Sequence, residues 1–404
     1  MKIIAGGVCA AKGFLANGIH CGIRKNKEKK DLALIYSQSR ANTASVYTTN
    51  KVKGAPLTVT KNNISDGYAQ AVICNSGNAN TCNANGIEIA EQMCALLGKA
   101  LKIDEKDVVV ASTGVIGQPL DITPIENGIP ALVNGLSSDA SQSAAEGIMT
   151  TDTRLKEIAV SFVVDGKECR IGGIAKGSGM IHPNMATMLI FITTDVNISK
   201  ELLDEALKED IKDSFNMISV DGDTSTNDMV TILANGMAEN AVIDKKDENF
   251  EIFKKALNKI TVSISRMIAG DGEGATKLLE CRVINAKSKE IAKMVSKSVI
   301  CSSLVKAAMF GSDANWGRVL CAIGYSGADV DVEKVDVSFE SAKGVIEVCK
   351  DGAGVEFSEE KAKETLLENE IIINIDLNDG KGEATAWGCD LTYDYVKING
   401  DYRT

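Results

Sequence analysis

Thr187 lies where a glycine-rich loop meets an apolar run, in the stretch KGSGMIHPNMATMLIFI of residues 176–192. The small side chain of Ala186 leaves its carbonyl open to the threonine hydroxyl. Attack of that hydroxyl on the carbonyl would form an ester, and hydrolysis would free Thr187 as a new N-terminus. Its α-amine, with a reference pKa of about 7.7–8.0, would then serve as a general base for the hydroxyl beside it. A self-processing nucleophile fits these residues, and so does a β-branched residue that merely opens a buried strand.

Two other polar motifs lack residues that their chemistry requires. Asp221 and Asp223 in DGDTSTND resemble a calcium loop, but the sixth and twelfth positions are Thr226 and Ile232, where glycine and a bidentate glutamate are needed. The segment GDGEGATK (270–277) has the glycines of a phosphate loop, yet threonine precedes its lysine and no strand signal precedes the segment. Neither motif predicts an ion or phosphate site.

Histidine and cysteine usage also narrows the chemistry. The chain has only two histidines, His20 and His182, and neither lies in a nucleophile-elbow pattern. The eleven cysteines are an odd number and include no CxxC pair, unlike a disulfide framework or a zinc site. We therefore expect no metal site, and we expect reduced thiols that are buried as small hydrophobic side chains.

The elements that must position these residues alternate between strand and helix signals. An apolar run at 107–112 indicates a buried strand, and 157–177 indicates a hairpin that turns at Asp165-Gly166. A second hairpin is expected in the tail, over 371–388 around Asp379-Gly380. Helical periodicity covers the segments 86–101, 200–218, 288–310 and 358–370. The pattern predicts an α/β protein.

Size and charge exclude several classes of function. A chain of 404 residues is long enough for two lobes, and a formal net charge of −11 opposes binding to nucleic acid or to an anionic membrane. The basic run RKNKEKK (24–30) is the one local exception, which we interpret as a solvated turn. No apolar run approaches the ~20 residues of a membrane span, and two glycines interrupt the N-terminal apolar stretch, unlike a signal peptide. We expect a cytoplasmic protein.

A series of motifs resembles the ornithine acetyltransferase (ArgJ-type) family of arginine biosynthesis. The processing-site stretch KGSGMIHPNMATMLIFITTD is one of them, and the others follow the family's order: KGFLANGIHCGI, VICNSGNANTCNANG (72–86), ASTGVIGQPL (111–120), GIMTTDT (147–153), SVDGDTSTNDMV (219–230), AGDGEGATK (269–277) and FGSDANWGRVLCAIGYSG (310–327). One departure is TCNANG, where the family usually has a compact Cys-Thr-Gly.

The resemblance implies a set of site residues. Thr187 matches the nucleophile, with cleavage after Ala186, and Thr113 with Gly114 matches the pair that forms the oxyanion hole. The substrate-binding positions match Thr150, Lys176, Thr187, Glu273, Asn399 and Thr404. Taken singly, each has a plainer interpretation, such as the end of a strand, a helix cap or a solvated charge. Their joint match to one family site favours function.

The implied reaction is glutamate N-acetyltransfer. Thr187 would take the acetyl group of N-acetylornithine as an ester and pass it to the α-amine of glutamate. Some family members also accept acetyl-CoA, and no residue here decides that point, so acetyl-CoA is a possible substrate while no cofactor is expected. Two alternatives remain open: a self-processed aminopeptidase or amidohydrolase that passes the acyl group to water, and an inactive homologue that only binds.

The resemblance also implies the architecture. We expect the layered αββα sandwich of the DmpA/ArgJ-like fold, with a smaller C-terminal α/β lobe over about 280–404. Self-cleavage would give an alpha chain of residues 1–186 and a beta chain of residues 187–404. Two of each would assemble into a heterotetramer.

Overall fold

The computed structural model describes residues 1–182 and 188–400, so Ala186, Thr187 and Thr404 lie outside the described part. The strands are β1 (Lys2–Ile4), β2 (Phe14–Ile19), β3 (Leu32–Tyr47), β4 (Tyr68–Asn75), β5 (Val108–Ser112), β6 (Lys156–Val164), β7 (Lys167–Lys176), β8 (Leu189–Thr194), β9 (Ile218–Ser219), β10 (Met229–Ala234), β11 (Leu278–Ala286), β12 (Asp336–Ser341), β13 (Gly344–Lys350), β14 (Ala353–Gly354), β15 (Glu370–Asp376) and β16 (Gly382–Cys389). The α-helices are α1 (Ala55–Asn63), α2 (Gly86–Leu101), α3 (Thr123–Asn134), α4 (Ser141–Ile148), α5 (Lys200–Asp210), α6 (Glu248–Gly270), α7 (Lys289–Cys301), α8 (Ser303–Phe310), α9 (Trp316–Gly324), α10 (Glu359–Leu366) and α11 (Tyr393–Gly400).

The larger sheet folds into two layers through one long strand. Its order is β1-β6-β7-β8-β10-β3-β4-β5, and β2 also pairs with β3. The first half of β3 pairs with β2 and β4, its second half pairs with β10, and the register with β4 shifts between Tyr36 and Ala41. Because sheets twist and irregular pairing adds bend, one strand can serve two layers in this way.

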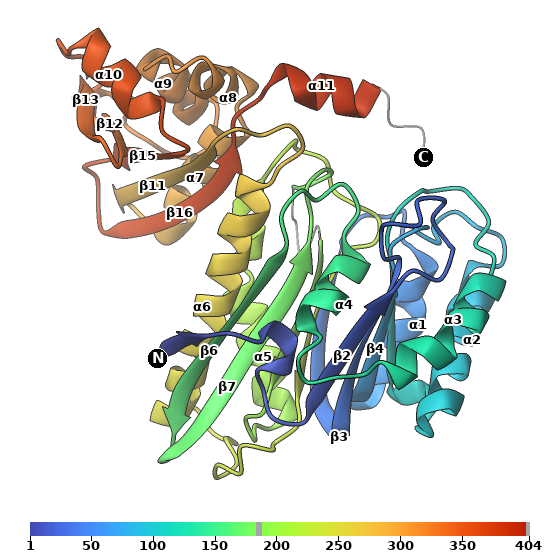
Figure 1. Cartoon of the computed structure of the whole chain (residues 1–404). Helices are drawn as coiled ribbons and strands as arrows, with labels where there is room; N and C mark the ends of the chain where they lie inside the picture. Colours follow the sequence, from blue (N-terminus) through green and yellow to red (C-terminus); the bar gives the residue numbers. More distant parts are fainter. Residues whose placement is uncertain (183–187, 401–404) are drawn as a thin grey trace.

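Three hydrophobic clusters confirm the αββα layering. The inner cluster joins apolar side chains of β2, β3 and β4 to those of β7 and β8, for example Ile35 to Phe191. On the outer face of the first layer Ile73 packs with Met93 of α2, and on the outer face of the second Ile190 packs with Phe253 of α6. Figure 1 shows α6 along β6 and β7, with α1 to α3 beyond β4.

A second sheet forms the C-terminal lobe, with order β14-β13-β12-β15-β11-β16-β9 and helices α7 to α10 packed around it (Figure 1). All strands of this sheet except β9 follow residue 277. Strand β9 pairs with β16 in parallel, with Ile218 opposite Trp387. The apolar face of α6 contributes to the same hydrophobic cluster as β11 and β16. The two lobes therefore share a continuous core.

The predicted tail hairpin is wrong. Strands β15 and β16 do not pair with each other, because β11 lies between them, parallel to β15 and antiparallel to β16. The turn at Asp379-Gly380 instead belongs to the connection from β15 to β16, which passes over the end of β11. There the Asp379 amide donates to the Asn285 carbonyl (2.8 Å), and a Cβ on Gly380 would lie 2.3 Å from the Ala286 oxygen.

Three predicted helices are shorter in the structure than expected. The helix predicted at 358–370 is α10, which ends at Leu366, and Glu370 already begins β15. The segment 288–310 divides into α7 and α8 at Ser302, whose backbone is extended and whose hydroxyl accepts from the Val305 amide (3.3 Å) as an N-cap. Helix α5 ends at Asp210, before the 3₁₀ turn Phe215–Met217. The hairpin of β6 and β7 is confirmed, with Asp165 and Gly166 both at positive φ, as a type I′ turn requires.

The cysteines are all free, but only six of the eleven are buried as expected. Cys82 and Cys321 are exposed, and Cys9, Cys21 and Cys301 are partly buried. Among the described residues, no helix has both the length and the apolar character needed to cross a membrane.

Candidate active site

One cavity brings together the predicted site residues that the structure describes. Its volume is about 360 Å³. Six of its lining residues were predicted for the site, namely Thr113, Gly114, Thr150, Lys176, Glu273 and Asn399. The other lining residues are Ala79, Val115, Ile116, Thr151, Gly179, Met180, Ser225, Thr226 and Asn227. Segments far apart in the sequence therefore meet around one space.

The wall that carries Thr113 and Gly114 follows β5 directly. Thr113 is buried, and its amide donates to the Asn75 carbonyl (2.9 Å). Gly114 has φ +129°, and a Cβ there would lie 2.9 Å from the Asn78 nitrogen and from the Gly77 carbonyl carbon. This position therefore requires glycine, both for its dihedral angle and for the close approach of another backbone.

The opposing backbone is held by asparagine side chains. Asn75 Oδ1 accepts from the amides of Gly77 (3.1 Å) and Asn78 (3.0 Å). Asn227 lies across the wall, and its Nδ2 donates to the carbonyls of Ala79 (2.5 Å) and Ser112 (2.9 Å). Such local bonds fix a loop that has no regular ladder of its own. Sequence reasoning did not single out Asn227, although it lies in a quoted motif.

Lys176 brings a cation to the same wall. It is the last residue of β7 and lies opposite Leu189 of β8, and its Nζ is 3.5 Å from Thr113 Oγ1. Met188, directly before β8, is buried, and its carbonyl accepts from the Met229 amide (2.9 Å). Strand β8 therefore begins beside Lys176, at Leu189, two residues after Thr187 in the sequence.

The C-terminal helix reaches the cavity through Asn399. Its Nδ2 donates to Glu273 Oε2 (2.9 Å), and a Cβ on Gly179 would lie 2.4 Å from the Glu273 side chain, so the carboxylate packs on the glycine loop. Helix α11 has no buried residue and extends away from the lobe in Figure 1. Its contact with the cavity is therefore a polar one.

A buried ion triad connects the loops that carry the substrate-binding candidates. Lys156, only 1% exposed, pairs with Asp152 (2.7 Å) and with Asp271. Asp152 also accepts from the amides of Thr150 (3.0 Å) and Gly177 (2.7 Å). Burial raises the pKa of Asp152, but the nearby lysines and these hydrogen bonds outweigh burial and leave the pKa below its usual range. Asp271 lies two residues before Glu273. Lys156 therefore links the three segments that carry Thr150, Lys176 and Glu273.

Replacing this lysine should destabilise the folded protein. Lys156→Met leaves two buried carboxylates without their cation, and we expect a loss of about 3–5 kcal/mol in the free energy of unfolding, with a higher KM for each substrate. Without the cation, burial raises the folded-state pKa of Asp152, so this deficit should be large at pH 7 and shrink as pH falls. Urea unfolding at several pH values measures it.

A double variant provides the control for this prediction. Lys156→Met with Asp271→Asn removes one carboxylate together with the cation, so part of the lost stability and its pH dependence should be recovered. A double variant that is no more stable than Lys156→Met, with the same pH dependence, would contradict the electrostatic explanation.

Asp228 is a second titratable group that sequence reasoning missed. It follows three cavity-lining residues, is buried, and its Oδ2 has no hydrogen-bond partner in the described part of the chain. Burial raises the pKa of Asp228 well above its usual range, against the opposing effects of Ser225 and Lys176. Burial therefore favours the neutral form of this acid. Nothing in its sequence context distinguishes it from an exposed aspartate.

The cavity thus has backbone and hydroxyl donors, a cation and a carboxylate around one space. Donors of this kind stabilise a developing oxyanion, and the charges suit a zwitterionic ligand with a second amine. Over residues 1–182 and 188–400, no three His, Cys, Asp or Glu side chains are grouped so that they could hold a metal ion.

Comparison with known proteins gives consistent results. The model of the ArgJ family matches residues 15–404. "Arginine biosynthesis bifunctional protein ArgJ" of Caldanaerobacter subterraneus subsp. tengcongensis is 52% identical over 405 residues, with 100% of each chain covered. "Arginine biosynthesis bifunctional protein ArgJ 1" of Clostridium acetobutylicum is 54% identical over 392 residues, which cover 97% of this chain and 96% of that protein. A crystal structure of the ArgJ bifunctional protein of Bacillus halodurans is 46% identical, with a TM-score of 0.50, and the match covers 52% of this chain and 98% of that chain.

Proposed function

The chain belongs to the ArgJ family, and from this premise we propose that its cavity moves an acetyl group from N-acetylornithine to glutamate through an ester on Thr187. The protein is an acyltransferase of arginine biosynthesis. The observation that supports the proposal is that one cavity is lined by Thr113 and Gly114, which we assign to the oxyanion hole, together with Lys176 and Glu273.

Self-cleavage would come first. Thr187 Oγ attacks the Ala186 carbonyl, the peptide nitrogen leaves as the α-amine of Thr187, and water then hydrolyses the ester to give a free carboxylate on Ala186. Residues 1–186 and 187–404 result. The match to about half of this chain by a nearly whole solved chain supports such a division.

Acetyl transfer would reuse the same hydroxyl. The α-amine of Thr187 takes the hydroxyl proton as Oγ attacks the acetyl carbonyl, and Thr113 and the Gly114 amide stabilise the tetrahedral oxyanion. The C–N bond breaks, the proton returns to the departing amine, and ornithine leaves. The α-amine of glutamate then attacks the acetyl ester, and Thr187 is regenerated with N-acetylglutamate as product.

Substrate recognition would use the charges of the cavity. Lys176 offers a cation to a substrate carboxylate, and Glu273 offers a carboxylate to the distal ammonium of ornithine. Asn399, already bonded to Glu273, supplies directional hydrogen bonds, and we assign the same role to Thr404. Thr150 is held at the rim by Asp152.

The name shared by the relatives, a bifunctional protein, supports acetyl-CoA as a second acetyl donor and an amino-acid N-acetyltransferase activity. We propose that the enzyme needs no cofactor, works in the cytoplasm and assembles as a heterotetramer of two alpha and two beta chains.

Trapping the intermediate tests the proposal. Enzyme incubated with N-acetylornithine and no glutamate should gain one acetyl group on Thr187 of the larger fragment, and double-reciprocal plots against both substrates should be parallel. Mass spectrometry of the denatured fragments measures the first result. Free acetate in place of N-acetylglutamate would indicate an amidohydrolase, and an intact, unlabelled chain without exchange would indicate an inactive binding homologue.

A further inference from the structure

An exposed basic loop lies between β2 and β3, and none of its residues lines the cavity described above. Lys25, Lys27 and Lys29 are exposed there, and in the described part of the chain none of them forms an ion pair, whereas Lys30 pairs with Glu146 (2.9 Å). Unpaired cations so close together raise the local potential of a chain whose net charge is −11.

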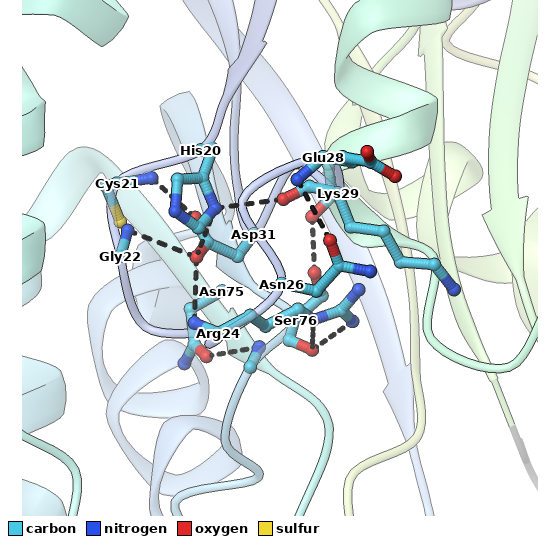
Figure 2. Close-up of polar contacts among 12 residues, drawn as sticks. His20, Cys21, Gly22, Arg24, Asn26, Glu28, Lys29, Asp31, Asn75 and Ser76 are labelled. Atoms are coloured by element: carbon cyan, nitrogen blue, oxygen red, sulfur yellow. Dashed lines mark hydrogen bonds and ion pairs between the residues drawn. The ribbon is translucent and has the colours of Figure 1, made fainter.

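The loop is not a freely solvated turn. Asp31 is fully buried at its end and accepts from the backbone amides of Cys21 (2.7 Å), Gly22 (3.2 Å) and Arg24 (2.9 Å). Figure 2 shows these bonds converging on the Asp31 carboxylate, while the side chain of Lys29 points away from them. One buried carboxylate therefore fixes the path of the backbone from which the lysines project.

The same loop is fastened to the cavity. The Arg24 guanidinium donates to the carbonyl of Ser76, as Figure 2 shows, and to that of Met149 (2.5 Å), the residue before Thr150. Ile23 packs on Gly77, where a Cβ would lie 2.4 Å from Ile23 Cγ2, and Gly77 in turn contacts Gly114. The basic loop is thus one layer of residues behind the candidate oxyanion wall.

A second lysine-bearing loop is hydrogen-bonded to a segment that lines the cavity. Lys51 and Lys53 are exposed between β3 and α1. Their loop is bonded to the segment after β9, with Asn50 Nδ2 on the Thr224 carbonyl (2.9 Å) and the Gly54 amide on that of Thr226 (3.0 Å). Two loops that carry exposed lysines are therefore hydrogen-bonded to segments that line or adjoin the cavity.

We propose that the loop of residues 24–30 binds the phosphate groups of acetyl-CoA when that molecule is the acetyl donor. The inference rests on the proposed function. The thioester must reach the oxyanion wall, so the flexible pantetheine arm leads out of the cavity and leaves the phosphates at its rim. Amino-acid substrates carry no phosphate, which accounts for a loop that their reaction does not use.

The reaction with this donor balances without a further reagent. Thr187 Oγ attacks the thioester carbonyl, the C–S bond breaks, and the proton taken by the α-amine leaves on the thiol of coenzyme A. Glutamate then attacks the acetyl ester as in the first reaction. The lysines contact only the non-reacting end of the donor, so they contribute to KM rather than to the chemical step.

Comparing donors on one enzyme tests the proposal. In the triple variant Lys25→Ala/Lys27→Ala/Lys29→Ala, KM for acetyl-CoA should rise about tenfold, the size expected for three exposed ion pairs. The kinetics with N-acetylornithine, and with acetylpantetheine, which has no phosphate, should not change. Added salt should raise KM for acetyl-CoA in the unsubstituted enzyme and much less in the variant.

The variant Lys99→Ala/Lys102→Ala/Lys106→Ala is the matched control, since these three lysines are exposed near the end of α2 and form no ion pair in the described part. It should leave all donors unaffected. An unchanged KM for acetyl-CoA in the first variant, or an equal rise in the control, would overturn the proposal. So would unsubstituted enzyme that turns over N-acetylornithine but neither uses acetyl-CoA nor binds coenzyme A by calorimetry. Absence of transfer from N-acetylornithine would instead contradict the proposed function itself.

Discussion

A Thr187→Ala variant is expected to remain one chain of 42.9 kDa and to lose acetyl transfer by on the order of 10⁶-fold, the cost of removing a serine nucleophile in a hydrolase. Both results follow because cleavage and transfer use one hydroxyl. The unsubstituted enzyme should show two fragments of roughly 20 and 23 kDa, in proportion to their 186 and 218 residues. Denaturing mass spectrometry and N-acetylglutamate formation measure the two effects.

Thr187→Ser is the control, because it keeps a hydroxyl and should retain both cleavage and measurable transfer. Thr187→Ala should also fold normally, since it removes only a hydroxyl and a methyl group. Transfer activity in an alanine variant, or an active unsubstituted enzyme found only as the intact chain, would exclude Thr187 as the common nucleophile.

A Gly114→Ala variant is expected to lose about 10²–10³-fold in kcat, as when one oxyanion donor is removed elsewhere. The added Cβ would lie 2.9 Å from backbone atoms of Gly77 and Asn78, so the peptide of Gly114 must move. Since φ is +129°, an L-residue is also strained there. Steady-state kinetics with N-acetylornithine and glutamate measures the loss.

Gly117→Ala is the control that distinguishes loss of the Gly114 amide donor from backbone strain at a positive φ. Gly117 lies in the same loop with φ +76°, but a Cβ there has no atom within 4 Å. It should show a modest loss of stability and little change in kcat. Equal kcat values for the two variants would show that the Gly114 amide is not an oxyanion donor.

Local patterns in the sequence predicted much of the secondary structure. Helix α2 covers the predicted residues 86–101, and the strand predicted at 107–112 is β5. Their apolar spacing and flanking polar residues are local properties, so a short window contains the information. The order of strands in a sheet is not local. The tail therefore resembled a hairpin, although β11 separates its two strands.

The candidate site also contains residues that the sequence predicted and residues that it did not. Motif resemblance located six of the residues that line the cavity, because they lie in motifs with a recognisable order of residue types. The residues that hold the loops in place gave no such signal. Lys156 lies in an alternating strand pattern in which a lysine normally faces solvent, yet it is 1% exposed. Only the path of the backbone reveals that two aspartates surround it.

The position of β8 and β10 gives cleavage an unusual consequence. These strands belong to residues 187–404 but lie between β7 and β3, which belong to residues 1–186, and each flanking ladder joins six residue pairs. The two cleavage products would therefore already share one hydrogen-bonded sheet at the moment when the peptide bond between them is broken. They need no encounter in solution to associate, they should not dissociate on dilution, and halves from different molecules should not exchange without unfolding.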